Sequence, residues 1–233
     1  PRQSKSNGSG GIFSGHIHWM IQQARKYCPQ GTIKIISNGD YLSREKLFLL
    51  HESGLDRLHV SVYLPNRQSW TLPTAHANVR RFLERIDCQT RKISHGRSKV
   101  EGVVDFPGLA ITFNCVNYDE VGLDRGEEIE SLVDRSYVRT EPCMQVFHNI
   151  TIDYDGTIMP CCNLRGDDPQ HKKYVLGKLS DSVSLMDIWT NAMFDTWRDG
   201  LQSFGQKNGP CKSCKQLTLS KLERVMVKPT WKL

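Results

Sequence analysis

Residues 141–162 read EPCMQVFHNITIDYDGTIMPCC, and residues 209–214 read GPCKSC. In the first stretch Ile150, Ile152 and Tyr154 alternate with polar residues, as in a half-buried strand. The dipeptide Asp155-Gly156 follows, which is typical of a tight turn that needs a positive φ, and three residues of β propensity come next. The pattern predicts a β-hairpin that returns the chain close to its starting point.

The cysteines around this hairpin have the spacing of metal ligands. The hairpin brings Cys143 near Cys161, and Cys-x-x-Cys at Cys211 and Cys214 places two more thiols on one face of a turn. Four thiolates that meet in this way hold either an iron–sulfur cluster or a structural zinc ion. The spacing alone leaves these two alternatives nearly even.

The first half of the chain alternates between helical and strand patterns. Helices are predicted over residues 16–28, 43–54 and 73–88, and strands over residues 32–37, 58–63 and 109–116. Alternation of this kind, with apolar strands, predicts a parallel sheet covered by helices. Residues 117–140 are mostly polar and charged, which indicates a connector with one helical turn.

Four basic residues, Arg91, Lys92, Arg97 and Lys99, are predicted to lie in a solvated loop, so nucleic-acid binding is not expected. The remaining cysteines are far apart in the sequence. Cys28, Cys88 and Cys115 are expected to be buried structural thiols, as free cysteines usually are.

The composition is that of a globular protein. Of 233 residues 38% are hydrophobic, the net charge is +6, and no apolar run approaches the ~20 residues that span a bilayer. The sequence shows no signal peptide. Eight cysteines could indicate a secreted disulfide scaffold. At this length, and with metal-type spacing in four of them, reduced thiols and a cytoplasmic location are expected instead.

The cysteine-rich part resembles the twitch domain of radical SAM enzymes, a shortened form of the SPASM domain. The resemblance rests on an ordered set of motifs: Cys143, Gly156 five residues before Cys161, Leu176-Gly177-Lys178-Leu179, Asp187-Ile188-Trp189 and the final Cys-x-x-Cys. It implies one auxiliary [4Fe–4S] cluster on Cys143, Cys161, Cys211 and Cys214. It also selects Cys161 over its neighbour Cys162, and iron over zinc.

The first half is similar to the same enzymes in three short motifs. They are Gly8-Ser9-Gly10-Gly11, Ser37-Asn38-Gly39 and Val60-Ser61-Val62. The resemblance implies that a pocket for S-adenosylmethionine is lined by Gly10, Gly11, Ser37, Asn38 and Ser61. Ligands commonly bind at the carboxyl ends of parallel strands, which is where these residues are expected.

Two features depart from the pattern of these enzymes. The motif Cys-x3-Cys-x2-Cys, which would hold a second, SAM-reducing [4Fe–4S] cluster, is absent, and Ile12 stands where an acidic residue is expected after Gly11. Either the sequence begins inside a longer protein that supplies the motif, or the chain is a degenerate member. We expect the first, since a barrel without its first strands would expose a long parallel edge.

The resulting hypothesis is an α/β protein. Residues 1–140 would form a partial radical SAM barrel, and residues 141–233 an auxiliary iron–sulfur domain with a β-hairpin and a helix. By the resemblance, the enzyme would be an oxidoreductase-type radical SAM enzyme that abstracts hydrogen from a small polar or peptide substrate. Its electron donor would be a flavodoxin or a ferredoxin. The alternative is a non-catalytic binding protein stabilised by zinc or a cluster.

The sequence does not reveal a general base, so the catalytic residues stay unknown. His16 and His18 are expected at the surface of the first helix. His148 shows no ligand-type spacing to either neighbouring cysteine, and Cys162 is interpreted as a passive neighbour of a ligand.

Overall fold

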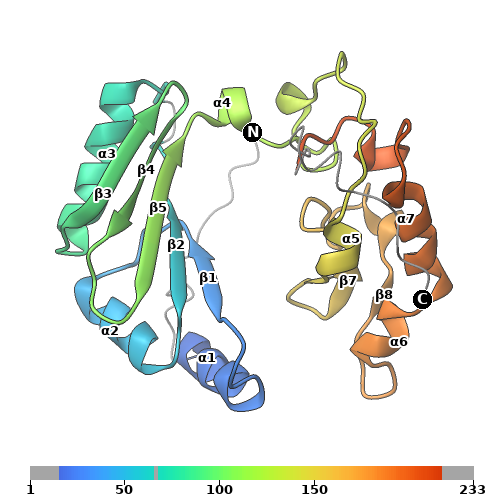
Figure 1. Ribbon diagram of the computed structural model, residues 1–233, viewed down its shortest axis with the longest axis horizontal. Coiled ribbons are helices and arrows are strands. Elements are labelled where there is room, and N and C mark those ends of the chain that lie inside the picture. The colour runs from blue at the N-terminus through green and yellow to red at the C-terminus, as the bar shows by residue number, and fades with distance from the viewer. Residues whose placement is uncertain (1–15, 66–67, 217–233) are drawn as a thin grey trace. The chain divides into compact units, whose positions relative to one another are not determined.

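The computed structural model describes residues 16–65 and 68–216, which form two compact units with a boundary between Val121 and Gly122. Each unit has its own sheet and its own hydrophobic core (Figure 1). Residues 122–140, which the sequence pattern grouped with the first domain, belong to the second compact unit.

The first unit is built on a five-stranded sheet with the order β1-β2-β5-β4-β3. The strands are β1 (Lys34–Ser37), β2 (Arg57–Ser61), β3 (Thr90–Gly96), β4 (Lys99–Val104) and β5 (Ala110–Val116). β1, β2 and β5 are parallel, which confirms the expected α/β class with a parallel sheet. β4 and β3 continue the sheet in the antiparallel sense.

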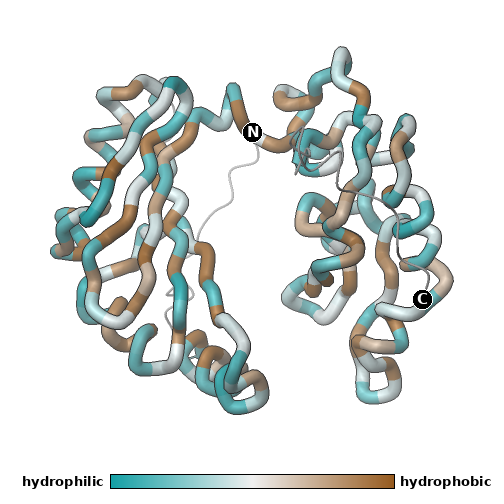
Figure 2. The backbone as a smooth tube through the Cα atoms, viewed as in Figure 1, coloured by the Kyte–Doolittle hydropathy of each residue, from teal (hydrophilic) through white to brown (hydrophobic). Residues whose placement is uncertain are grey.

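Three helices cover one face of this sheet: α1 (His16–Tyr27), α2 (Arg44–Glu52) and α3 (Leu72–Arg85). Their buried side chains pack against the strand residues that alternate toward them, as the hydropathy along β5 illustrates (Figure 2). Ser43 caps α2 by accepting a hydrogen bond from the Lys46 amide, and Gly54 follows the helix end with φ +98°. The short helix α4 (Tyr118–Val121) follows β5.

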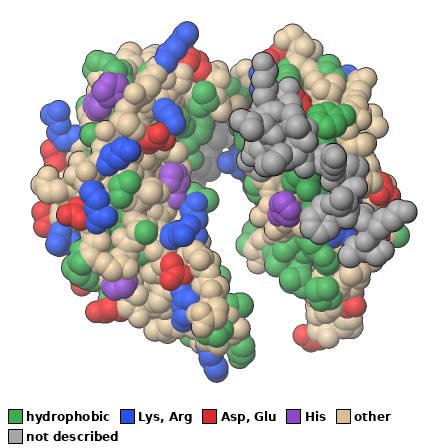
Figure 3. Space-filling view, in the orientation of Figure 1, with side chains coloured by type: hydrophobic (Ala, Val, Ile, Leu, Met, Phe, Trp, Pro, Cys, Tyr) green, Lys and Arg blue, Asp and Glu red, His purple; other side chains and the backbone are tan. Residues whose placement is uncertain are grey.

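The prediction that the four basic residues lie in a loop is wrong, because this segment forms the antiparallel hairpin of β3 and β4. Every residue from Arg91 to Arg97 is exposed, so β3 has no buried face and no apolar alternation that a sequence pattern could reveal. Lys and Arg side chains are interspersed with acidic ones over the visible face of this unit (Figure 3). Arg91, for example, pairs with Asp105 at 3.0 Å.

Burial corrects one further expectation next to α1. Cys28, directly after this helix, is exposed rather than a buried structural thiol. Within the helix, Met20 is 54% exposed. α1 packs at the margin of the sheet through Ile21 and the half-buried Ile17. A narrow apolar stripe along the helix is therefore sufficient to hold it there. Cys88 and Cys115 are buried, as expected.

The second unit contains the predicted hairpin, formed by β6 (Thr151–Ile152) and β7 (Thr157–Met159). Gly156 adopts φ +85° in its turn, a conformation that glycine reaches without steric cost. A third strand, β8 (Gly177–Lys178), pairs with β7. The helices are α5 (Gln145–His148), α6 (Leu185–Trp189) and α7 (Ala192–Gln202), with 3₁₀ turns η1 (Glu130–Leu132), η2 (Lys172–Tyr174) and η3 (Gly209–Cys211).

Capping explains how the helices of this unit begin. Ser184 and Asp187 form a capping box at the start of α6. α6 ends at Trp189, and Asn191 caps the next helix, α7, by accepting a hydrogen bond from the Phe194 amide. Within residues 16–65 and 68–216, no helix combines the length and the apolarity needed to cross a membrane.

A glycine-to-alanine pair tests the β3–β4 hairpin. A Cβ atom on Gly102 would lie 2.5 Å from the Lys92 carbonyl oxygen and 2.5 Å from a Phe113 ring carbon. We expect Gly102→Ala to lower the free energy of unfolding by about 1–3 kcal/mol. Gly96→Ala is the matched control in the same hairpin, where the nearest atom is 4.0 Å away. Urea unfolding measures the stability of both variants. Equal unfolding midpoints for Gly102→Ala and Gly96→Ala would contradict the close packing of Gly102 in the hairpin.

Candidate metal centre

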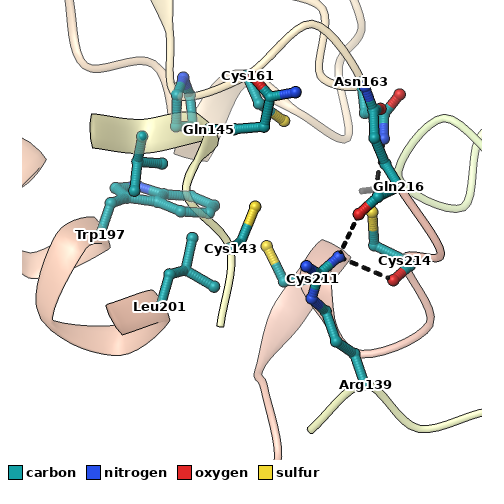
Figure 4. A pocket seen from close by; sticks show the side chains of 12 residues that line it. Arg139, Cys143, Gln145, Cys161, Asn163, Trp197, Leu201, Cys211, Cys214 and Gln216 are labelled. Carbon is teal, nitrogen blue, oxygen red and sulfur yellow. Dashed lines mark hydrogen bonds between the residues drawn. The ribbon is translucent and has the colours of Figure 1, made fainter. Parts of the chain in front are cut away.

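Four cysteine thiols line one cavity in the second unit, and we call Cys143, Cys161, Cys211 and Cys214 the four-cysteine cage. Figure 4 shows their sulfur atoms around a common space. Cys143 lies just before α5, Cys161 follows β7, and the other two come from η3 and the turn after it. The structure thus brings together the four cysteines selected from the sequence.

Short local structures hold the cysteines in place. The β6–β7 hairpin returns the chain so that Cys161 comes near Cys143, whose amide donates to the carbonyl oxygen of Leu201 at the end of α7 (2.9 Å). The Cys214 amide donates to the Cys211 carbonyl oxygen (3.4 Å), which closes the Cys-x-x-Cys turn. The cage therefore depends on hairpin, helix and turn together.

The cavity is largely apolar, with Val146, Trp197 and Leu201 in its lining. Burial raises the pKa of Cys161 and of Cys211 to about 12. Such thiols stay protonated at neutral pH, so a metal centre must supply the positive charge that stabilises their thiolates. Metal binding would accordingly release protons from the cage.

Polar side chains complete the surroundings of the sulfur atoms. The amide Nδ2 of Asn163 donates a hydrogen bond to Cys214 Sγ at 3.5 Å. Hydrogen bonds to sulfur are one of the means by which proteins adjust thiolate-bound clusters.

Cys162 lies outside the lining of the cavity. Its side chain is exposed and accepts a hydrogen bond from Gln216 Nε2 at 3.7 Å. Consecutive residues after a strand point in different directions, so Cys161 and Cys162 are presented to different surroundings.

The donor set of the cage consists of thiols. Four cysteine thiolates can hold either an iron–sulfur cluster or a zinc ion. Among residues 16–65 and 68–216, no three His, Cys, Asp or Glu side chains are already arranged around a single point.

The first unit presents the candidate cofactor residues Ser37, Asn38 and Ser61 at the carboxyl ends of β1 and β2. Ser37 Oγ accepts a hydrogen bond from the Gly39 amide (3.1 Å), which shapes the turn after β1. β1 and β2 are parallel neighbours, so these ends lie at the same edge of the sheet. Gly10 and Gly11 lie outside the described residues.

Sequence reasoning missed a polar array on the sheet face opposite the helices. His59 Nδ1 lies 2.9 Å from Thr112 Oγ1, and Asn114 lies beside the same ring. The buried Asn114 Oδ1 has no hydrogen-bond partner of ordinary geometry within the described part of the chain. The available signal was the alternation in LHVSV, which points His59 and Ser61 away from the buried Leu58 and Val60.

The chemistry of this array is that of neutral hydrogen-bonding groups. Burial, followed by the charge of Lys34, lowers the pKa of His59 below its ordinary value. A neutral imidazole at physiological pH can accept a proton or a hydrogen bond from a ligand. At the end of β2 the ring of Tyr63 stacks on that of Tyr118 with centroids 5.3 Å apart.

The other histidines considered in the sequence have structural or surface positions. His18 is half-buried, and its Nδ1 lies 3.0 Å from Ser53 Oγ, whereas His16 is exposed. His148 is exposed at the end of α5 and does not line the cage cavity.

Comparison with known proteins agrees with this geometry. Residues 143–215 match the SPASM model, described as an iron-sulfur cluster-binding domain. The second unit therefore contains a SPASM-type iron–sulfur cluster-binding domain.

The fold is similar to that of BtrN. The crystal structure of BtrN in complex with AdoMet and 2-DOIA matches with a TM-score of 0.54 and 18% identity, over 90% of this chain and 70% of BtrN. An open conformation of selenomethionine BtrN gives a TM-score of 0.49 and 16% identity, over 88% of this chain and 66% of that one. Comparison with curated proteins gives no match. The resemblance to radical SAM proteins with a twitch or SPASM domain is thus confirmed in domain type and fold.

Replacing each of two adjacent cysteines tests which one faces the metal. Cys161→Ala should abolish most iron binding and lower the melting temperature, because one of four ligands is lost and metal binding is coupled to folding. Cys162→Ala, the matched control, should retain its iron because that thiol is exposed. Iron and sulfide analysis after anaerobic reconstitution measures both, and equal iron loss would refute the assignment of Cys161.

Proposed function

We propose that the chain is the part of a radical SAM oxidoreductase-type enzyme that carries cofactor-binding strands and an auxiliary [4Fe–4S] cluster. The observation that carries the proposal is the convergence of four cysteines on one cavity, within a segment that matches an iron–sulfur cluster-binding domain. The similarity in fold between 90% of this chain and BtrN supports the accompanying barrel part.

The cage would hold the auxiliary cluster through all four of its thiolates. Such a cluster supplies one-electron transfer with little rearrangement of its ligands. The chain's own contribution is to keep water from the sulfur atoms, through Val146, Trp197 and Leu201, and to orient Cys214 through Asn163. A cluster with four cysteine ligands has no iron with a free coordination site, so it would transfer electrons rather than bind S-adenosylmethionine.

S-adenosylmethionine would bind at the carboxyl ends of the parallel strands, at Ser37, Asn38 and Ser61 together with Gly10 and Gly11. Hydroxyl, amide and glycine main-chain groups suit a ligand with amine, carboxylate and ribose functions. The substrate, a small polar molecule or a peptide, would lie against the helix-free face of the sheet, where His59 and Asn114 offer hydrogen-bonding groups. A flavodoxin or ferredoxin would supply electrons, in the cytoplasm.

The alternative is a binding protein that uses zinc or a cluster for stability alone. The match of residues 143–215 to an iron-sulfur cluster-binding domain favours a cluster over zinc. The absence of Cys-x3-Cys-x2-Cys from these 233 residues is the feature that favours the alternative. Metal content and S-adenosylmethionine binding distinguish the two.

The first test is the identity of the metal. We expect anaerobically prepared protein to be brown, with broad visible absorption from charge transfer between sulfur and iron, and to contain iron and sulfide in equal amounts. Metal analysis, absorption and EPR spectroscopy make the measurement. A colourless protein with one zinc and no iron would refute the iron–sulfur assignment.

The second test separates the auxiliary role from the radical-forming role. The 233 residues alone should form no 5′-deoxyadenosine with dithionite and S-adenosylmethionine, since no three closely spaced cysteines are present to hold a cluster with an open iron. A longer natural chain that supplies Cys-x3-Cys-x2-Cys should form it. Steady formation by the 233 residues would show that the cage, and not a second cluster, performs the chemistry.

A further inference from the structure

Two cations are buried in the second unit, and one of them, Arg139, lines the cavity of the four-cysteine cage. Arg139 is 0% exposed and Lys207 is 3% exposed. A lysine is almost never fully buried unless it is paired. Main-chain hydrogen bonds join them: the Lys207 amide donates to the Arg139 carbonyl oxygen at 3.2 Å, and the Arg139 amide donates to the Lys212 carbonyl oxygen at 2.8 Å. Lys212 lies between the two cysteines of the Cys-x-x-Cys turn.

The guanidinium of Arg139 connects the two ends of the cage. Its Nη2 donates to the carbonyl oxygen of Pro142, directly before Cys143, at 2.9 Å. Its Nη1 donates to the carbonyl oxygens of Cys214 (3.2 Å) and Gln216 (2.7 Å). One side chain thus ties the segment of the first cysteine to that of the last, and its charge remains next to both.

Lys207 is held next to the main chain that contacts Cys143, because Gly200 and Ser203 flank Leu201, whose carbonyl oxygen accepts a hydrogen bond from the Cys143 amide. Its Nζ donates to the carbonyl oxygens of Gly200 (3.3 Å) and Ser203 at the end of α7, and no ion pair of Lys207 occurs within residues 16–65 and 68–216. Burial and the charge of Arg139 lower the pKa of Lys207, and the groups that oppose this effect are Cys211 and Cys143. A buried ammonium without a carboxylate is costly, so the cage is where its negative counterpart is expected.

We propose that Arg139 and Lys207 are the counter-charges of the four-cysteine cage and raise the reduction potential of the cluster that it holds. Arg139 is in addition a positioning residue, because it fixes the segments of Cys143 and Cys214. The proposal rests on the proposed function, since it requires that the cage holds an iron–sulfur cluster.

The direction of the effect follows from charge. Reduction adds one negative charge to a cluster that four thiolates already make anionic, and a nearby buried cation stabilises the reduced form more than the oxidised form. Removal of the Lys207 charge should therefore shift the equilibrium toward the oxidised cluster. We expect a change of about tenfold, which for one electron corresponds to a potential lower by about 59 mV.

A purely structural role for Lys207 makes a different prediction. If its ammonium only caps the carbonyl groups at the end of α7, a neutral donor in its place should change stability without changing the potential. Lys207→Gln keeps a donor but removes the charge. Lys172→Gln is the matched control, because Lys172 is an exposed lysine of the same unit that does not line the cage cavity.

The experiment is an EPR-monitored redox titration of reconstituted protein, with iron content and melting temperature measured on the same samples. We expect Lys207→Gln to hold its iron at the lower potential and Lys172→Gln to match the wild type. Arg139→Lys should keep the potential but lose iron faster to a chelator. Arg198→Gln is the control at a partly buried arginine outside the cavity lining, and it should retain the cluster at wild-type potential.

The outcomes distinguish a failure of the counter-charge proposal from a failure of the iron–sulfur cluster assignment on which it rests. An iron-loaded Lys207→Gln protein at the wild-type potential would overturn the counter-charge proposal and leave the cluster assignment standing. A wild-type protein that binds no iron and sulfide would overturn both. If Lys207→Gln does not fold, Lys207→Met is used instead, because the methionine side chain fills the same space without a charge. A wild-type potential in the iron-loaded Lys207→Met protein would likewise overturn the counter-charge proposal.

Discussion

Four thiols have to reach one cavity from positions spread between residues 143 and 214, and the second unit is arranged to meet this requirement. Its strands have only two or three residues each, and its core is much smaller than that of the first unit. With so little apolar surface to bury, we expect metal binding at the four cysteines to contribute to the free energy of folding, as in other small metal-binding domains. The Cys143–Leu201 hydrogen bond and the Arg139 contacts close the segment around the cavity.

The two units place their polar groups by different means. In the first unit a parallel sheet aligns strand ends, so hydroxyl and amide groups separated in sequence share one edge. In the second unit tight turns position the thiols, because the left-handed glycine at position 156 and the Cys-x-x-Cys turn each fix one side of the cage. The regular sheet offers room for a ligand with several functional groups, whereas the turns enclose a compact centre.

The sequence was most informative where a pattern reports local chemistry. The turn at Asp155-Gly156, the capping box at Ser184 and the strand that ends at Ser37 could all be predicted, because each depends on neighbouring residues. The exposed strand β3 could not, because an edge strand without a buried face leaves no alternation. The array of His59, Thr112 and Asn114 depends on the register between β2 and β5, which no local pattern gives. Arg139 and Lys207 were also missed, since burial of a cation is a property of tertiary packing.

The antiparallel hairpin at one end of the first sheet has a consequence for how that sheet can grow. β3 is the outermost strand, all of its residues from Arg91 to Gly96 are exposed, and several are charged, which discourages another strand from pairing there. The opposite margin is different: β1 has only four residues, and its Ile36 is 68% exposed. Any additional strand, whether from the same polypeptide or from another, would therefore pair with β1. The sheet can be extended at this edge only.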